Sequence, residues 1–194
     1  IELVRLARAK GLRVGATTNG TLINEELAES LLEEGMEVLA FSLAGTTALN
    51  DRFRKGASLE KVLTGIKLIK QVKERKASQF PKINLAYLLL RSGLDDLDDL
   101  PALLAGRGVD QVVVSTLDFV PAENLKEEAI IPSTADEYDS LAVRLEEVAA
   151  ECARIKVEFH YQIYHPGRRR IFCTERPREA LFICSDGAVS PCVF

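Results

Sequence analysis

In the segment Phe41-Ser42-Leu43-Ala44-Gly45, a hydroxyl and small residues directly follow an apolar run that begins at Val38. An apolar run of this kind predicts a buried strand, and the polar residues mark its end. A second run, Leu12 to Ala16, ends in the same way, in Thr17-Thr18-Asn19-Gly20. Repeated strands with polar tips predict a parallel sheet whose carboxyl edge binds a ligand, and therefore an enzyme.

Outward from this segment, strand and helix patterns alternate about five times. We expect the first four strands to end near Ala16, Leu43, Leu90 and Ser115, and a fifth strand from Val157 to Tyr161. This alternation predicts an α/β fold with a parallel sheet and right-handed crossovers. Periodicity leaves open whether the sheet is open or part of a barrel.

Several helix boundaries can be predicted from capping residues. The expected N-caps are Asn24, Ser58 and Thr134, the last with Glu137 at capping-box spacing, and Gly11 is the expected stop of the first helix. We expect a helix from Leu94 to Leu104, whereas the segment that carries Arg54 shows little helical periodicity.

The composition is that of an ordinary globular protein. The 194 residues are 47% hydrophobic and 28% charged, with 25 basic and 29 acidic side chains and a net charge of −4. This balance argues against a nucleic-acid partner, and no apolar run is long enough to predict a membrane span. The amino terminus resembles neither a signal peptide nor a start, so we expect a cytoplasmic protein of which this chain is an internal piece.

The pattern changes near residue 165, where we expect a domain boundary between 1–164 and 165–194. Arg168 to Arg170 form a basic run that is more simply a solvated loop than a partner site. Ala180 to Ile183, the turn Ser185 to Ala188 and Val189 then predict a β-hairpin.

Three of the four cysteines, Cys173, Cys184 and Cys192, lie in this last segment, with spacings of eleven and eight. Three thiolates suit iron–sulfur or zinc, and the alternatives are buried free thiols or a single disulfide. Cys152 lies among alanines on an expected helix, which predicts a packed core thiol.

The strand tips offer candidate ligand-binding groups. Asn19-Gly20 supplies an amide and a permissive backbone, Ser42 a hydroxyl, and Arg54 a guanidinium that can grip a carboxylate with two hydrogen bonds. Each also has a purely structural explanation. Asn19-Gly20 can be an ordinary turn, the Ser42 hydroxyl can be satisfied by local backbone, and Arg54 can be a solvated surface arginine.

Four motifs together resemble the radical S-adenosylmethionine (SAM) superfamily. They are TTNGTLI at 17–23, FSLAG at 41–45, NDRFRKG at 50–56 and REALFICSDGAVSPC at 178–192, and the last is similar to members with a SPASM or twitch extension. The resemblance implies a partial (β/α)6 barrel, which is a TIM-like fold. It also implies a [4Fe–4S] cluster on a CxxxCxxC loop, whose electron cleaves SAM to a 5′-deoxyadenosyl radical that abstracts a substrate hydrogen.

The same resemblance implies roles for particular residues. Ser42 and Arg54 would contact the ribose or carboxylate of SAM, and Thr18 and Asn19 would line the same cavity. Leu117, in the TLD segment at 116–118, would lie near the adenine. Cys173, Cys184 and Cys192 would bind an auxiliary [4Fe–4S] cluster that needs a further ligand.

The chain departs from the family pattern in two respects that matter. It contains neither a CxxxCxxC loop nor a glycine-rich GGEP-like segment. We therefore expect the first two barrel strands and the cluster loop to lie outside this piece, which alone would be inactive. The sheet edge near Val14 would then be exposed and prone to self-association.

The implied partners are a peptide, protein or small-molecule substrate and an electron donor such as ferredoxin or flavodoxin. One alternative is a non-catalytic α/β binding module with a zinc-binding cysteine tail. Another is an α/β enzyme for a phosphorylated ligand, which the lack of a glycine-rich phosphate loop disfavours.

Overall fold

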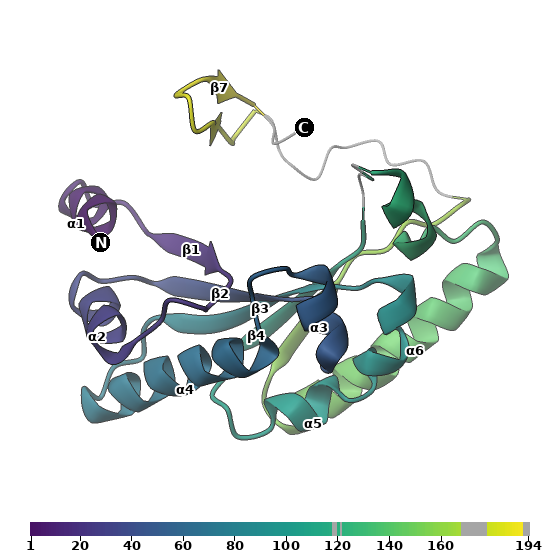
Figure 1. Cartoon of the computed structure of the whole chain (residues 1–194), viewed down its shortest axis with the longest axis horizontal. Coiled ribbons are helices and arrows are strands. Elements are labelled where there is room, and N and C mark those ends of the chain that lie inside the picture. The colour runs from purple at the N-terminus through teal and green to yellow at the C-terminus, as the bar shows by residue number, and fades with distance from the viewer. Residues whose placement is uncertain (118–119, 121, 168–177, 192–194) are drawn as a thin grey trace.

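A five-stranded parallel sheet forms the centre of the protein (Figure 1). The computed structural model describes residues 1–117, 120, 122–167 and 178–191. The strands are β1 (Gly15–Thr18), β2 (Val38–Leu43), β3 (Lys82–Leu88), β4 (Gln111–Ser115) and β5 (Glu158–Tyr161). Their spatial order follows their order in the sequence, with β1 and β5 at the edges, so the described residues form an open part of a barrel. The parallel α/β prediction is confirmed.

The helices that follow the strands lie along one side of the sheet (Figure 1). The α-helices are α1 (Glu2–Ala9), α2 (Glu25–Glu33), α3 (Ala48–Phe53), α4 (Leu59–Arg75), α5 (Leu100–Leu104) and α6 (Ala135–Arg154). Short 3₁₀ turns are η1 (Arg91–Gly93), η2 (Asp95–Leu97) and η3 (Glu123–Glu128). Together α2, α4 and α6 cover one face of the sheet and leave the other open.

Burial alternates along β2 because successive side chains point to opposite faces of the sheet. Leu39, Phe41 and Leu43 are buried and belong to the core beneath the helices, whereas Ala40 and Ser42 are half-buried on the open face. The same alternation runs along β3, where Leu85 and Tyr87 are buried. The open face is therefore where a bound molecule can reach the sheet.

Two predicted strand ends and one predicted helix differ from the structure. Strand β1 ends at Thr18 rather than Ala16, because Thr17 and Thr18 pair with β2, and β3 ends at Leu88 rather than Leu90. The helix expected over residues 94–104 is divided into η2 and α5, and Pro101 explains the break. Proline lacks the N–H that a continuous α-helix would need at that position.

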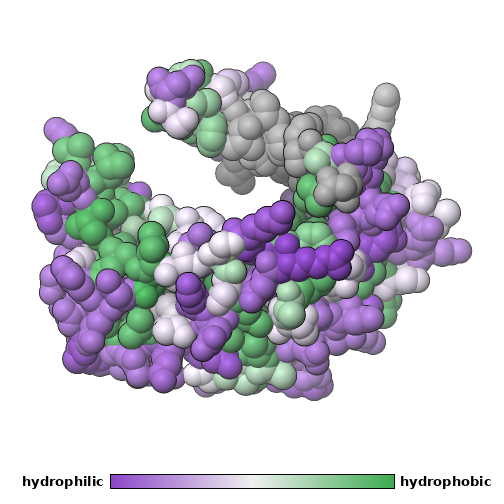
Figure 2. All heavy atoms as spheres, viewed as in Figure 1, coloured by the Kyte–Doolittle hydropathy of each residue, from purple (hydrophilic) through white to green (hydrophobic). Residues whose placement is uncertain are grey.

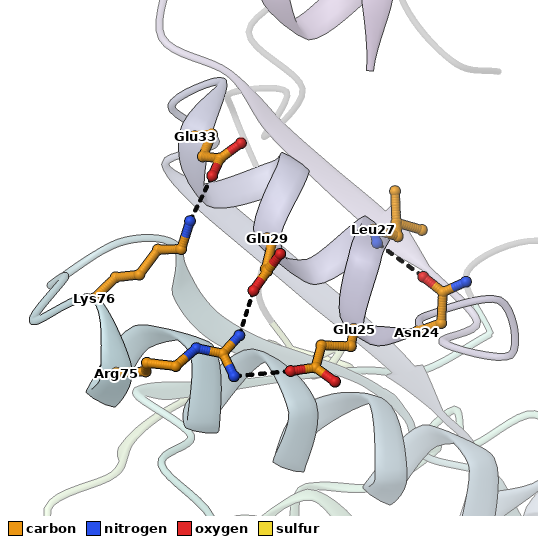
Figure 3. A network of polar contacts seen from close by, with 7 residues as sticks. All are labelled: Asn24, Glu25, Leu27, Glu29, Glu33, Arg75 and Lys76. Carbon is orange, nitrogen blue, oxygen red and sulfur yellow. Dashed lines mark hydrogen bonds and ion pairs between the residues drawn. The ribbon is translucent and has the colours of Figure 1, made fainter.

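The predicted caps are confirmed, and ion pairs join α2 to α4 (Figure 3). Asn24 Oδ1 accepts a hydrogen bond from the Leu27 N–H at 2.8 Å and caps α2. Arg75, near the end of α4, binds Glu25 at 2.8 Å and Glu29 at 2.5 Å. Ser58 caps α4 and Thr134 caps α6, while the Glu137 carboxylate accepts from Ser133.

We predict that Asn24→Ala lowers the free energy of unfolding by about 0.5–2 kcal/mol, because the first turn of α2 loses its cap. Urea denaturation of the protein measures the change. Asn24→Ser keeps a capping oxygen and is the matched control, which should stay close to the wild type. Equal stability of the alanine and serine variants would contradict the prediction.

The tail of the described chain contains a short two-stranded sheet. Strands β6 (Phe182–Ile183) and β7 (Val189–Ser190) pair antiparallel, which confirms the predicted hairpin. Arg168 to Arg170 lie outside the described residues. In the described part of the chain, no helix is long and apolar enough to cross a membrane.

Apolar side chains gather over α1 on the surface (Figure 2). Leu3 is 80% exposed and Leu6 is 59% exposed, and no residue of α1 is buried. Ion pairs from Arg8 and Arg13 to Glu37 attach this region to the start of β2. In the described sheet β1 is an edge strand, which is where we expect self-association. That self-association stays a prediction.

Candidate functional site at the carboxyl edge of the sheet

The predicted site residues that follow β1 and β2 lie at the same edge of the sheet. Thr18 pairs with Phe41, so Asn19 follows at the level of Ser42 on the neighbouring strand. Because both strands run parallel, their carboxyl ends meet here. The structure thus brings Thr18, Asn19 and Ser42 together, as their positions at the ends of separate strands predicted.

The three side chains differ in orientation and in free hydrogen-bonding capacity. Thr18 shares the helix-covered face with Phe41, and its Oγ1 accepts from the Gly20 N–H at 3.1 Å. Asn19 is exposed, and its Oδ1 accepts from the backbone and hydroxyl of Thr21 at 3.2 and 3.0 Å. These contacts belong to the turn itself. The Ser42 hydroxyl and the Asn19 amide nitrogen make no hydrogen bond within the described residues.

Gly20 fixes this turn against the core. Its φ is +72°, and a Cβ atom there would lie 2.9 Å from Cδ1 of Phe41. Only glycine combines this backbone conformation with so close an approach. The turn is therefore pressed onto the ring of Phe41.

The segment after β2 is more ordered than its sequence predicted. Although the sequence around Arg54 shows little helical periodicity, residues 48–53 form α3 and Arg54 is its C-cap. Thr47 caps the helix, and the fully buried Asn50 accepts from the Ala44 N–H at 3.0 Å. These side-chain contacts stabilise a helix too short to show hydrophobic periodicity.

Asp96 of η2 holds the same loop from the other side. Its Oδ2 accepts from the backbone N–H of Thr46 at 2.8 Å, and from the backbone and hydroxyl of Thr47 at 3.1 and 2.9 Å. Sequence reasoning missed this residue, since it lay within an expected helix with other aspartates around it. No local pattern distinguishes it.

Arg54 is a half-buried cation without a counter-ion in the described part of the chain. Its Nε is buried and has no hydrogen-bond partner, and the guanidinium forms no ion pair with any residue that the structure describes. Burial lowers the pKa of Arg54 from its usual value, yet a guanidinium remains charged at neutral pH. A desolvated, unpaired guanidinium is suited to a carboxylate, which would satisfy both its charge and its hydrogen-bond donors.

Leu117 is half-buried and follows β4 at the same edge, two strands away from Ser42. It could pack against a planar group that lies over the edge of the sheet. The structure therefore places it near the end of the sheet that carries the other candidates.

Of the three candidate metal ligands, one lies among the described residues. Cys184 is a half-exposed free thiol in the tail hairpin, while Cys173 and Cys192 lie outside the described residues. Among the described residues, no group of three or more His, Cys, Asp or Glu side chains could hold a metal ion. Cys152 is a buried free thiol, as predicted, and burial raises its pKa to about 11.

Tyr87 lies beneath the site and is 1% exposed, and its hydroxyl has no hydrogen-bond partner in the described part of the chain. Burial raises the pKa of this hydroxyl, and the nearby Asp96 charge raises it further. We predict that Tyr87→Phe leaves the free energy of unfolding unchanged or raises it by up to about 1 kcal/mol, because an unpaired buried hydroxyl is removed.

The matched control is Tyr161→Phe, which removes a hydroxyl that is hydrogen-bonded to Glu146 and should be the less stable variant. Urea denaturation compares the two. A loss of stability in Tyr87→Phe larger than that in Tyr161→Phe would show that the Tyr87 hydroxyl has a partner, such as a buried water.

Comparison with known proteins gives one family. Residues 1–80 match the Radical SAM superfamily. The chain is 24% identical over 197 residues to the tungsten-containing aldehyde ferredoxin oxidoreductase cofactor-modifying protein of Pyrococcus furiosus, covering 99% of this chain and 52% of the relative. It is 48% identical over 58 residues to the Fe-coproporphyrin III synthase of Methanosarcina barkeri, covering 29% of this chain and 14% of the relative.

Solved structures share the fold. Streptococcus suis SuiB bound to S-adenosylmethionine superposes with a TM-score of 0.71 at 16% identity, over 99% of this chain and 45% of that one. AnSMEcpe with bound AdoMet has a TM-score of 0.59 at 18% identity, over 83% of this chain and 43% of that one. The chain thus spans about half the length of the Pyrococcus relative and of SuiB.

Proposed function

We propose that this chain, which matches the Radical SAM superfamily over residues 1–80, forms the SAM-binding part of an enzyme that modifies a peptide, protein or small molecule. The observation that carries the proposal is Arg54, a partly desolvated guanidinium that has no counter-ion among the residues described and follows the loop after β2. SAM offers a carboxylate that matches it. Two SAM-bound structures with this fold support the assignment.

The described residues fit SAM but not the cluster that the family uses with it. In the proposal Arg54 binds the SAM carboxylate, while Ser42 and Asn19 present free hydrogen-bonding groups to the ribose. Thr18 holds the turn that carries Asn19, and Leu117 packs near the adenine. The chain has no CxxxCxxC motif, so we assign none of its residues to the cluster that reduces SAM.

When bound, SAM supplies on one-electron reduction a carbon radical that removes a hydrogen atom from the substrate. The part of this chain in that chemistry is to orient SAM and to exclude water from one side of it. The open face of the sheet beside Ser42 leaves room for a substrate. We place the protein in the cytoplasm and propose a ferredoxin or flavodoxin as the electron donor.

The substrate we propose is a peptide or protein. SuiB bound to its precursor peptide SuiA has the same fold, which supports this choice. A second candidate is a tetrapyrrole, favoured by the 48% identity to the Fe-coproporphyrin III synthase over 58 residues. The tail cysteines Cys173, Cys184 and Cys192 are proposed ligands of an auxiliary [4Fe–4S] cluster.

The test is anaerobic incubation of the protein, expressed from its complete gene, with iron, sulfide, a strong reductant and SAM. We expect reductive cleavage of SAM to 5′-deoxyadenosine, measured by chromatography. A protein that binds zinc through its tail and neither binds nor cleaves SAM would instead be the non-catalytic binding module. The 194-residue polypeptide alone should yield no 5′-deoxyadenosine, because it lacks the CxxxCxxC ligands.

A further inference from the structure

We propose that Asp96 is a positioning residue for SAM: it fixes the loop between Ser42 and Arg54, and so sets the distance between these two groups. The proposal rests on the proposed function, because it takes this edge of the sheet as the SAM site. Asp96 itself contacts only protein in the described structure. Its effect on SAM would pass through the loop that it holds.

The contacts of Asp96 join the segments that follow two neighbouring strands, β2 and β3. One carboxylate oxygen accepts three hydrogen bonds, from the Thr46 N–H, the Thr47 N–H and the Thr47 hydroxyl, at 2.8 to 3.1 Å. The Thr46 hydroxyl in turn donates to the backbone carbonyl of Asp96 at 3.0 Å. Charge-assisted hydrogen bonds are stronger than neutral ones, so this residue ties the loop after β2 firmly to the segment after β3.

Gly45 allows the carboxylate to come this close. Its φ is +138°, and a Cβ atom there would lie 2.8 Å from Oδ2 of Asp96 and 3.2 Å from the backbone nitrogen of Asn50. Any side chain at residue 45 would therefore displace the carboxylate or the loop. Gly45 and Asp96 form one close-packed unit.

The loop that Asp96 holds connects the two proposed SAM contacts in the sequence. Ser42 precedes it in β2, and Thr47 is both a partner of Asp96 and the N-cap of α3, whose C-cap is Arg54. The backbone N–H of Arg54 is bound to the Asn50 carbonyl at 2.9 Å. A shift of the loop therefore moves Arg54 relative to Ser42.

Neighbouring aspartates show that Asp96 has a separate role. Asp95 and Asp98 pair with Arg144 of α6 at 3.1 and 2.7 Å, so they attach this segment to the helix layer. Asp99 is exposed and makes no capping hydrogen bond at the start of α5. Asp96 is the member of this acidic segment that turns toward the SAM loop.

The experiment measures SAM binding by equilibrium dialysis of the reconstituted protein, expressed from its complete gene. Asp96→Asn, Gly45→Ala and the control Asp99→Asn are compared with the wild type, with urea unfolding and circular dichroism as readouts of structure. We expect Asp96→Asn and Gly45→Ala to remain folded and to raise the Kd for SAM by about tenfold, with Asp99→Asn unchanged.

Three other outcomes would contradict this expectation. If Asp96→Asn is folded and binds SAM like the wild type, the positioning role is overturned. If Asp96→Asn does not fold, the role is also overturned, because the carboxylate would then serve the stability of the fold. If the wild-type protein itself does not bind SAM, the proposed function fails, and the inference that rests on it fails with it. A wild type that binds SAM beside an unaffected Asp96→Asn variant refutes the positioning role alone.

Discussion

Replacing Arg54 with alanine is expected to raise the Kd for SAM by about 10- to 150-fold, because charge-assisted hydrogen bonds to a carboxylate are lost. The guanidinium is partly desolvated and has no counter-ion among the described residues, so its interaction with a bound anion is only weakly screened by water. Equilibrium dialysis with SAM on the reconstituted protein measures the change.

Two variants make this result specific. Arg54→Lys keeps the charge but not the planar pair of donors, and should bind SAM with intermediate affinity. Arg52→Ala removes an exposed arginine two residues away, whose guanidinium lies 5.5 Å from the centre of the Phe53 ring, and should bind like the wild type. Equal affinities of the two alanine variants would refute the assignment.

Replacing Arg54 should weaken SAM binding but stabilise the folded protein. A half-buried charge without a partner destabilises the folded protein, so Arg54→Met is expected to unfold at a higher urea concentration in the absence of SAM. Higher stability together with weaker SAM binding would identify a residue retained for binding. A residue that only supports the fold would lose stability when replaced.

Much of the fold follows from local sequence. The strand of Val38 to Leu43, the caps at Asn24, Ser58 and Thr134, and the tail hairpin depend on neighbouring residues, and each is present in the structure. The placement of Thr18, Asn19 and Ser42 at one edge followed from the parallel order of the strands. These features needed only periodicity, turn chemistry and the handedness of crossovers.

The features that sequence reasoning missed depend on contacts between distant residues. Helix α3 is held by Asn50 and by Asp96, which lies about 50 residues further along the chain, so its formation has no local signature. The orientation of Thr18 toward the helix-covered face depends on register, because a shift by one residue would reverse it. The break before α5 could have been predicted from Pro101.

Phe41 gives the largest predicted effect on stability. It is fully buried on β2, beneath the turn that carries Asn19. A Cβ atom at Gly20 would lie 2.9 Å from its ring, and one at Gly65 of α4 would lie 3.1 Å from it, so the ring fills the space between the turn and the helix. Phe41→Ala should lower the free energy of unfolding by about 3–5 kcal/mol, because burial is lost and a cavity remains.

Controls separate this packing role from the general effect of removing a phenylalanine. Phe80→Ala deletes a ring that is 47% exposed and should cost far less, while Phe41→Leu should cost less than about 1.5 kcal/mol, because it fills most of the volume. Urea denaturation of the three variants gives the comparison. If Phe41→Ala and Phe80→Ala were equally stable, the turn would not depend on the ring beneath it. Support for Asn19 would then have to come from the hydrogen bonds of Thr18 and Thr21 within the turn.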